Sequence, residues 1–454
     1  MSLAAWFLSA ALATQESPAS PSTPPSFDPA VLEGLRAAAW PLATVEAGHG
    51  FADLAPLKAW VGDARIVALG EATHGTREFF QAKHRLLEYL VAECGFTQFA
   101  MEANWPESLA VNDYVLHGTG DAKRALAGLY FWTWNTEEVL ALIEWMRAWN
   151  ADPAHATKVQ FAGVDMQVIT VAARATLDYL QKAAPSLAEQ QEARLTRLAN
   201  LRTSSPQHGQ PGSKSHAQGI EEQAALDALV AAFDEEMDAW LLESSEEEWA
   251  IARQQAVVMA QAHRAGLPND EGLSGFEWRD RCMAENLRWL LRQGGPEARV
   301  VVWAHDGHVS RGMAVGTQRW RNMGWHLARA AEQHPDERLT MKVAGFSFAT
   351  GAFQAMGGSG GGASEWRIDA PLAGSIDAAF AAAGLSRHFV DLHASPAGSA
   401  ARAWLDEPRV KRGIGSVWSP EAAARNEDVA YDRWPDAFDA LLFIDGTTRA
   451  RPVR

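Results

Sequence analysis

Short apolar runs alternate with longer amphipathic stretches over most of the chain. The run RIVALGE (65–71) is apolar on both faces, which is typical of a strand buried inside a parallel sheet. The stretch 78–94 repeats its apolar residues at helical spacing, and Gly95 marks its end. The alternation predicts an α/β fold with a central, largely parallel sheet flanked by helices. Further strands are predicted at 96–102, 161–166, 298–306, 341–349, 388–392 and 439–445, and further helices at 29–60, 106–117 and 136–150.

A long helical stretch interrupts this alternation. From 170 to 294 the pattern is almost wholly helical, apart from a polar, glycine-containing break at 202–219. The chain has 454 residues, enough to bury a large core. We therefore predict one α/β domain over 29–454 that carries a large helical insert at about 170–294.

The first 28 residues differ in composition from the rest. Residues 3–13 are apolar but too short to cross a bilayer, and they end in the small residues that a signal peptidase requires. No Lys or Arg precedes Arg36, so the usual basic start is missing. We predict a signal peptide at 1–14, a Pro/Ser-rich spacer at 15–28, and a periplasmic or secreted protein without a stable membrane span. Without a functional signal peptide the protein would be cytoplasmic.

Charge and cysteine content narrow the classes of function. The net charge is −16, and no run of Lys and Arg forms the basic stripe that binds a phosphate backbone. We therefore expect no nucleic-acid partner. Cys94 and Cys282 are the only thiols and lie far apart, so neither a disulfide framework nor a CxxC site is expected. Most of the 19 Trp residues should fill the core, and some could line a pocket for a bulky apolar ligand.

Four of the predicted strands end in residues capable of acid–base chemistry. In open α/β sheets, reactive groups gather beyond the carboxyl ends of the strands, where loops converge on a rigid edge. The sequence therefore predicts that one edge carries Glu71, His74, Glu102, Asp165, His305 and His308.

His74 is the predicted general base. A histidine that is neutral near physiological pH can take a proton from water, and a carboxylate can fix its tautomer and stabilise the imidazolium. Either Glu102 or Glu71 could supply that carboxylate. A second imidazole, His305 or His308, could donate to the oxyanion or to the leaving alkoxide.

A divalent metal is the alternative to a metal-free site. Glu71, His74, His305 and His308 are all ligand types that zinc accepts. The helical HExxH motif is absent, and because Glu71 and His74 follow a strand, helical spacing is not expected to bring them together. We expect no cofactor, and keep a metal held by these four residues as the alternative.

Other catalytic motifs are absent or out of context. Residues 357–361 formally match the G-x-S-x-G elbow of serine hydrolases, but they lie in a glycine tract with no helix after it, which indicates a loop. Neither a GxxxxGK[ST] phosphate loop nor a GxGxxG fingerprint after a strand is present.

An ordered set of motifs resembles the erythromycin esterase family, which includes macrolide esterases and succinoglycan-biosynthesis-like hydrolases. The resemblance implies an erythromycin esterase-like or ChaN-like α/β fold with a helical insert. It also implies hydrolysis of a carboxylic ester or macrolactone, as in members that confer antibiotic resistance, without a covalent intermediate. The motifs are ALGEATHG within 68–105, FAGVDMQ (161–167), RDRCMAENLRWLL (279–291), VVWAHDGHV (301–309) and MGWHLA (323–328).

The resemblance also implies roles for single residues. His74 matches the family's general base, Glu102 its partner carboxylate, and His305 and His308 the later histidine pair.

Two positions depart from the family's pattern. Lys83 stands where some members have Arg, so the charge is kept and bidentate geometry is lost. Asp306 replaces the more usual Asn between the two later histidines, and this negative charge is expected to raise their pKa. We assign substrate-binding or supporting roles to Glu71, Arg77, Lys83 and Asp165.

Two other functions are kept as alternatives. One is a metal-dependent hydrolase on the same scaffold. The other is a non-enzymatic exported protein that binds haem or another ligand, similar to the iron-uptake lipoproteins of this general architecture. The expected partner is a small-molecule ester or lactone, which the fold alone does not specify.

Overall fold

The computed structural model describes residues 27–202, 208, 212–269, 271–315, 318–357 and 362–453. The predicted signal peptide and nearly all of the spacer lie outside these residues. No helix in the described ranges is long and apolar enough to cross a membrane. The chain divides into two compact units, the first made of residues up to Glu102, 110–162 and 287–454, and the second of 103–109 and 163–286.

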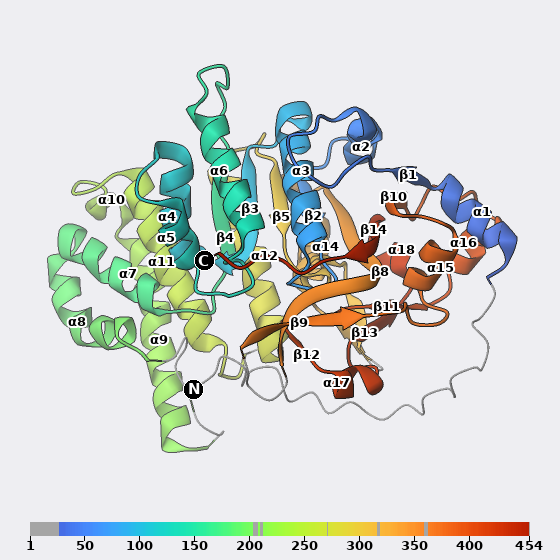
Figure 1. Cartoon of the computed structure of the whole chain (residues 1–454). Helices are drawn as coiled ribbons and strands as arrows, with labels where there is room; N and C mark the ends of the chain where they lie inside the picture. The colour runs from blue at the N-terminus through green and yellow to red at the C-terminus, as the bar shows by residue number, and fades with distance from the viewer. Residues whose placement is uncertain are drawn as a thin grey trace. The chain divides into compact units, whose positions relative to one another are not determined.

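Ten of the described strands form one mixed sheet (Figure 1). Its central strands run parallel to one another, and the strands at one edge are antiparallel. The predicted α/β fold with a largely parallel central sheet is therefore confirmed. The strand order is β1 (Ala39–Pro41), β10 (Arg387–Asp391), β14 (Ala440–Thr447), β8 (Met341–Gly357), β2 (Ile66–Leu69), β5 (Val300–Trp303), β3 (Gln98–Asn104) and β4 (Gln160–Asp165), with β9 (Ala363–Ile368) and β12 (Val417–Trp418) also pairing with β8.

Three neighbouring strands set the position of the predicted site. Every residue of β2 and β5 is buried, as expected for strands with helices on both faces. The register pairs Trp303 at the end of β5 with Leu69 of β2 and with Met101 of β3. The strands β2 and β5 end at these positions, whereas β3 continues to Asn104. The residues that follow Leu69, Met101 and Trp303 therefore lie at the same end of the three strands.

The helix α3 (Arg77–Cys94) follows β2 and carries the predicted apolar stripe. It ends as expected at Gly95, whose φ of 71° is the left-handed conformation that glycine adopts readily. Its neighbours include α6 (Glu137–Ala151), β5 and β14. Cys94 and Cys282 are both free thiols.

The single helix expected at 29–60 is not formed. This segment instead contains α1 (Pro29–Ala37), β1, a 3-10 turn η2 (Ala52–Leu54) and α2 (Ala55–Val61). The strand β1 forms because it pairs with β10, a partner more than 300 residues away that local periodicity does not report. The remaining elements of the first unit are α5 (Ala122–Ala127), α13 (Asp306–Val309), β6 (Met313–Val315), β7 (Gln318–Trp320), α14 (Met323–Gln333), η3 (Pro335–Glu337), α15 (Ile376–Ala382), α16 (Ala400–Leu405), β11 (Arg409–Arg412), α17 (Pro420–Ala424), β13 (Val429–Asp432) and α18 (Trp434–Ala437).

The second unit is helical. Ser245 begins α11 (Glu246–Arg264) with a capping box, in which Ser245 and Glu248 each bind the other's backbone N–H. Within the polar break expected at 202–219, helix begins again at Lys214. The helices are α7 (Thr170–Ala183), α8 (Pro185–Ala199), α9 (Lys214–Glu235), α10 (Met237–Trp240) and α11 (Glu246–Arg264), with α4 (Trp105–His117) and α12 (Gly275–Gln293) each shared with the first unit.

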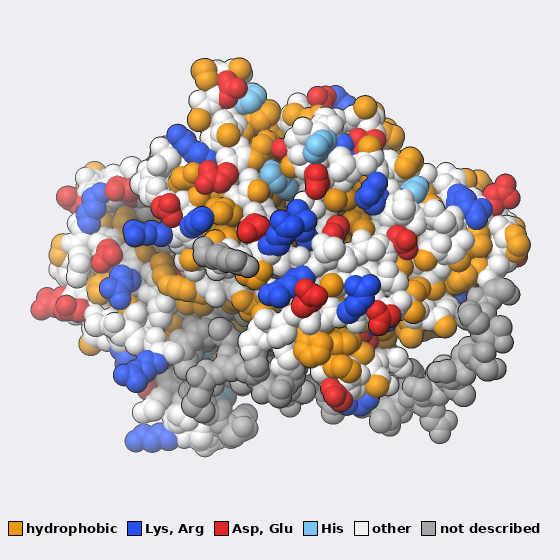
Figure 2. Space-filling view, viewed as in Figure 1, with side chains coloured by type: hydrophobic (Ala, Val, Ile, Leu, Met, Phe, Trp, Pro, Cys, Tyr) orange, Lys and Arg blue, Asp and Glu red, His pale blue; other side chains and the backbone are white. Residues whose placement is uncertain are grey.

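Charged side chains of both signs are mixed on the face drawn in Figure 2, where Lys and Arg lie among Asp and Glu. The expectation that nucleic acid is not a partner stays a prediction. The residues of the G-x-S-x-G match lie mostly outside the described ranges, and they join β8 to its antiparallel neighbour β9. They therefore do not join a strand to a helix, as a nucleophile elbow does.

Candidate active site

The loop after β2 holds Glu71 and His74 against each other. Glu71 Oε1 lies 2.7 Å from His74 Nδ1, and both side chains are buried. The expectation that these residues stay apart without a helix is wrong, because the loop bends at Ala72 and turns at His74 and Gly75. A carboxylate only accepts, so Nδ1 carries the hydrogen and Nε2 the lone pair. Within the described chain, Nε2 of His74 has no hydrogen-bond partner.

The other oxygen of Glu71 accepts from two more donors. Lys83 Nζ lies 2.6 Å from Oε2, and Trp303 Nε1 lies 2.8 Å from it. The Lys83 ammonium also sits 4.5 Å from the centre of the Trp303 ring. Burial lowers the pKa of Lys83 to about 8, and the charge of Glu71 acts in the opposite direction. Three donors thus fix Glu71, and Glu71 in turn orients His74.

Glu102 contacts the later histidine pair. Its Oε2 accepts the backbone N–H of His305 at 2.9 Å, and its Oε1 lies 3.2 Å from His308 Nε2. The implied pairing of Glu102 with His74 is therefore wrong, since Glu71 takes that place. The edge of the sheet carries two carboxylate–imidazole pairs, Glu71–His74 and Glu102–His308.

His305 is held in one neutral tautomer. Its Nδ1 accepts the N–H of Gly307 at 3.0 Å, and its Nε2 lies 3.1 Å from the carbonyl oxygen of Ile414, which can only accept. The ring centre is 4.9 Å from that of His74 and 6.5 Å from that of His308. Burial lowers the pKa of His305 well below its ordinary value, and the two neighbouring histidines lower it further.

Asp306 does not face the histidines that flank it in sequence. Its Oδ2 accepts from Lys411 Nζ at 2.5 Å, and its Oδ1 accepts from Phe346 N at 3.1 Å. A Cβ on Gly70 would lie 1.9 Å from Oδ1, so only glycine allows this close approach. The expected rise in the histidine pKa is wrong for His305, where Lys411 contributes to lowering it.

Trp134 connects the two carboxylate–imidazole pairs. Its ring packs edge-on against His74, with centres 5.7 Å apart and planes at 85°. Its Nε1 donates to the backbone oxygen of Glu102 at 2.9 Å. One buried side chain thus bounds the ring of the predicted base and anchors the strand end that carries Glu102.

The sequence matches the family model described as erythromycin esterase over residues 91–447, more than half of the chain. The chain belongs to the erythromycin esterase family. The resemblance carried by the ordered motifs is thereby confirmed. Erythromycin esterase type II of Escherichia coli is 25% identical over 74% of this chain and 83% of its own length.

Several solved structures share the fold. A protein from Bacillus cereus superposes with a TM-score of 0.79 at 26% identity, covering 93% of this chain and 98% of that one. An erythromycin esterase mutant in its open conformation gives a TM-score of 0.66 at 17% identity, covering 89% of this chain and 96% of that one. The erythromycin esterase-like fold is confirmed. Membership in this family supports a hydrolase activity and suggests an ester substrate.

Two predicted supporting residues form ion pairs of their own. Asp165, in the second unit, accepts from Arg279 Nη2 at 2.8 Å and from Gln167 Nε2 at 2.6 Å. Arg77, at the start of α3, has its Nε 3.3 Å from Glu138 Oε1. A role in substrate binding stays a prediction for Asp165 and Arg77.

The donor set does not fit the metal alternative. Among the described residues, no group of three or more His, Cys, Asp and Glu side chains is placed to hold a metal ion. Both oxygens of Glu71 and both ring nitrogens of His305 are already engaged in hydrogen bonds. A tetrahedral zinc site needs free donor atoms that point to one centre, and these two residues do not offer them.

Four residues of this site escaped the sequence analysis. Trp134 and Trp303 were treated only as two of the 19 tryptophans, without a role of their own. No local sequence pattern shows what their ring N–H groups contact. Lys411 and Ile414 lie 105 and 109 residues from their partners in the site. Only a three-dimensional structure brings them there.

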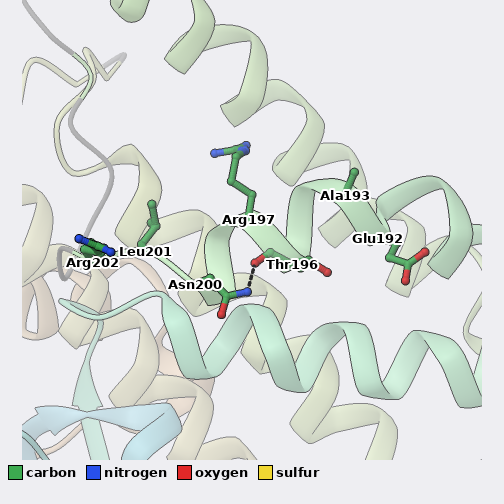
Figure 3. Close-up of a pocket in the computed structure, with 7 residues that line it drawn as sticks. All are labelled: Glu192, Ala193, Thr196, Arg197, Asn200, Leu201 and Arg202. Atoms are coloured by element: carbon green, nitrogen blue, oxygen red, sulfur yellow. Dashed lines mark hydrogen bonds between the residues drawn. The ribbon is translucent and has the colours of Figure 1, made fainter.

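A surface hollow of about 690 Å³ lies elsewhere, on the second unit along α8 (Figure 3). None of the predicted catalytic residues line it. Asn200 on this face donates to the Thr196 backbone oxygen at 2.7 Å. The lining residues are Glu192, Ala193, Thr196, Arg197, Asn200, Leu201 and Arg202.

Proposed function

We propose that the protein is a carboxylic ester hydrolase in which His74 activates water as a general base. The supporting observation is the Glu71–His74 pair, with Nδ1 bound to a buried carboxylate and Nε2 without a partner in the described chain. A ring nitrogen with a free lone pair, held in a fixed orientation, is what a general base requires.

In the proposed reaction a water molecule gives a proton to His74 Nε2 while its oxygen attacks the ester carbonyl. The imidazolium that forms faces the carboxylate of Glu71, which stabilises it. The tetrahedral oxyanion then collapses, the C–O bond to the alkoxide breaks, and the alkoxide takes up a proton. The products are a carboxylic acid and an alcohol, which stay joined when the substrate is a lactone. No covalent intermediate is expected.

The second imidazole in this proposal is His308. The contacts of His305 occupy both of its ring nitrogens, so His305 is the weaker candidate to donate a proton. His308 lies beside Glu102, which orients its ring. We assign to His308 the donation to the oxyanion or to the leaving alkoxide.

For the substrate we propose an erythromycin-type macrolide or a related ester. The proposal rests on the name of the Escherichia coli relative and on family membership. A water-activating histidine does not select the ester, so a panel of substrates is needed.

Mass spectrometry of substrate mixtures tests the proposal. Erythromycin and a set of small esters would be incubated with wild type, His74→Ala and His117→Ala, the last replacing an exposed histidine as control. We expect the addition of one water with wild type and His117→Ala, and its loss with His74→Ala. Hydrolysis that persists in purified His74→Ala would assign the base to another residue.

Two further measurements separate the alternatives. Activity that survives dialysis against a chelator argues against a metal-dependent hydrolase. Haem titration that produces a Soret shift, in a protein that hydrolyses nothing, would favour the non-enzymatic binding protein.

For localisation we propose export to the periplasm or the medium. Fractionation followed by N-terminal sequencing checks this, because cleavage after about residue 14 would leave a mature chain beginning in the Pro/Ser-rich spacer. An intact N-terminus in the cytoplasmic fraction would contradict it.

A further inference from the structure

A short segment after β11 contacts both loops that carry the histidines. Ile414 N donates to the backbone oxygen of Ala72 at 2.6 Å, between Glu71 and His74 in sequence. Its carbonyl oxygen lies 3.1 Å from His305 Nε2, on the other loop. One residue therefore bridges the loop after β2 and the loop after β5.

Lys411 adds an ion pair to the same loop. Its ammonium lies 2.5 Å from Asp306 Oδ2, with 2% of the Lys411 side chain and 3% of the Asp306 side chain exposed. Lys411 also donates to the backbone oxygen of Arg412 at 3.1 Å. Because Asp306 begins α13, the short helix that carries His308, this ion pair fixes the helix relative to β11.

The segment is itself anchored from a third direction. Arg412 N donates to Asp377 Oδ2 at 2.9 Å, and the other oxygen of Asp377 accepts from the Ser347 hydroxyl. Asp377 is buried at the start of α15, and Ser347 lies on the central strand β8. These hydrogen bonds connect the segment from Lys411 to Ile414 to the core of the sheet, so the segment is held in place.

These contacts determine what His305 can do. An imidazolium cannot accept from Gly307 N, and the opposite neutral tautomer cannot donate to the Ile414 carbonyl. Either change would break one of the two hydrogen bonds that hold the ring. His305 therefore has one allowed proton state while the segment stays in place.

We infer that residues 411–414 are a positioning segment. It keeps His305 neutral, with its proton on Nε2, and it holds the loop after β2 and the loop after β5 in a fixed position relative to each other. Proton transfer then falls to His74 and His308. The inference rests on the proposed hydrolysis for its catalytic part only, because the proton state of His305 can be measured without turnover.

A charge-neutral double variant separates positioning from stability. Lys411→Met alone leaves the buried carboxylate of Asp306 without its ion-pair partner, and we expect this single variant to be strongly destabilised. Asp306→Asn together with Lys411→Met removes both charges and keeps the side-chain volumes close to native. We expect the melting temperature of the double variant to approach that of wild type. Its kcat should stay reduced by about 10²-fold, the loss that a misplacement of about 1 Å produces, with a much smaller change in KM.

Lys342→Met is the matched control, since it removes a lysine that stacks on Trp60 away from the histidines. It should leave kcat unchanged. NMR of ¹⁵N-histidine-labelled protein gives the second measurement, with His305→Asn used to assign the signal. Wild type should show His305 with its proton on Nε2 alone, and the double variant should show a mixture of tautomers. A double variant that recovers kcat together with its melting temperature, and keeps the single tautomer, would overturn the inference.

Discussion

Replacing Glu71 with Gln tests whether this carboxylate sets the tautomer of His74. Lys83 Nζ and Trp303 Nε1 both donate to one oxygen of Glu71, at 2.6 and 2.8 Å. In Glu71→Gln only the amide oxygen accepts, so we expect it to face these two donors. The NH₂ group must then face His74 Nδ1, which has to accept, and the ring proton moves to Nε2.

The size of the effect follows from the loss of the free lone pair. With Nε2 protonated, His74 cannot take a proton from water. The same carboxylate-to-amide change in a serine protease triad lowers kcat by about 10⁴-fold through the wrong tautomer, equivalent to about 5 kcal/mol of transition-state stabilisation. We expect a loss of this order in kcat and a much smaller change in KM, because the substrate contacts are not altered.

Glu71→Ala is the comparison variant, because it removes the carboxylate without fixing the tautomer of His74. Alanine leaves His74 free to place its proton on either nitrogen, whereas glutamine forces the inactive tautomer. Glutamine also fills the space, so Glu71→Gln should unfold at the higher temperature of the two. Ester hydrolysis at pH 6 to 9 and thermal unfolding by circular dichroism measure both quantities. The reasoning is refuted if Glu71→Gln keeps activity within tenfold of wild type, or clearly exceeds Glu71→Ala in kcat.

Two further predictions concern Trp134 and Glu107. Trp134→Phe removes the hydrogen bond that Trp134 Nε1 donates to the backbone oxygen of Glu102. We expect a loss of about 0.5–1.5 kcal/mol in the free energy of unfolding, measured by denaturant titration, and a lower kcat in ester hydrolysis. Unchanged stability would contradict this. Burial raises the pKa of Glu107 from 4.5 to about 8. Between these two pH values the Glu107 carboxyl keeps its proton in the folded state and loses it in the unfolded state. Stability should therefore fall by up to about 1.4 kcal/mol per pH unit as the pH rises through this range. Glu107→Gln should lose that part of the pH dependence, and identical slopes in the two proteins would exclude it.

The sequence was sufficient to predict that the candidate residues after three of the strands, β2, β3 and β5, lie close together. The strands before Glu71, Glu102 and His305 are continuous apolar runs, and such runs become parallel neighbours in an α/β sheet. The residues that follow parallel neighbouring strands lie at the same end of the sheet. The proximity of these residues therefore follows from the hydrophobic pattern and from the alternation of strands and helices along the chain. The end of α3 at Gly95 was predictable for the same kind of local reason.

The sequence was not sufficient to predict the pairing of side chains at that edge. Whether Glu71 or Glu102 binds His74 depends on loop bends that no periodicity encodes. The direction of Asp306 depends on Lys411, 105 residues further on. Sequence proximity to the histidines suggested that Asp306 would act on them, yet its carboxylate points to β8 and β11.

Three imidazoles at one edge of a sheet would hinder one another as proton carriers if all could titrate freely, since each positive charge disfavours the next. The hydrogen bonds of this site give the rings different proton states. His74 presents a free Nε2, and His308 lies against Glu102. His305 keeps its proton on Nε2, facing a backbone carbonyl. When His74 takes up a proton in the proposed reaction, the positive charge of its ring is stabilised by the carboxylate of Glu71. Because His305 stays neutral, no second positive charge on the adjacent ring opposes this. One histidine can therefore act as a base beside another.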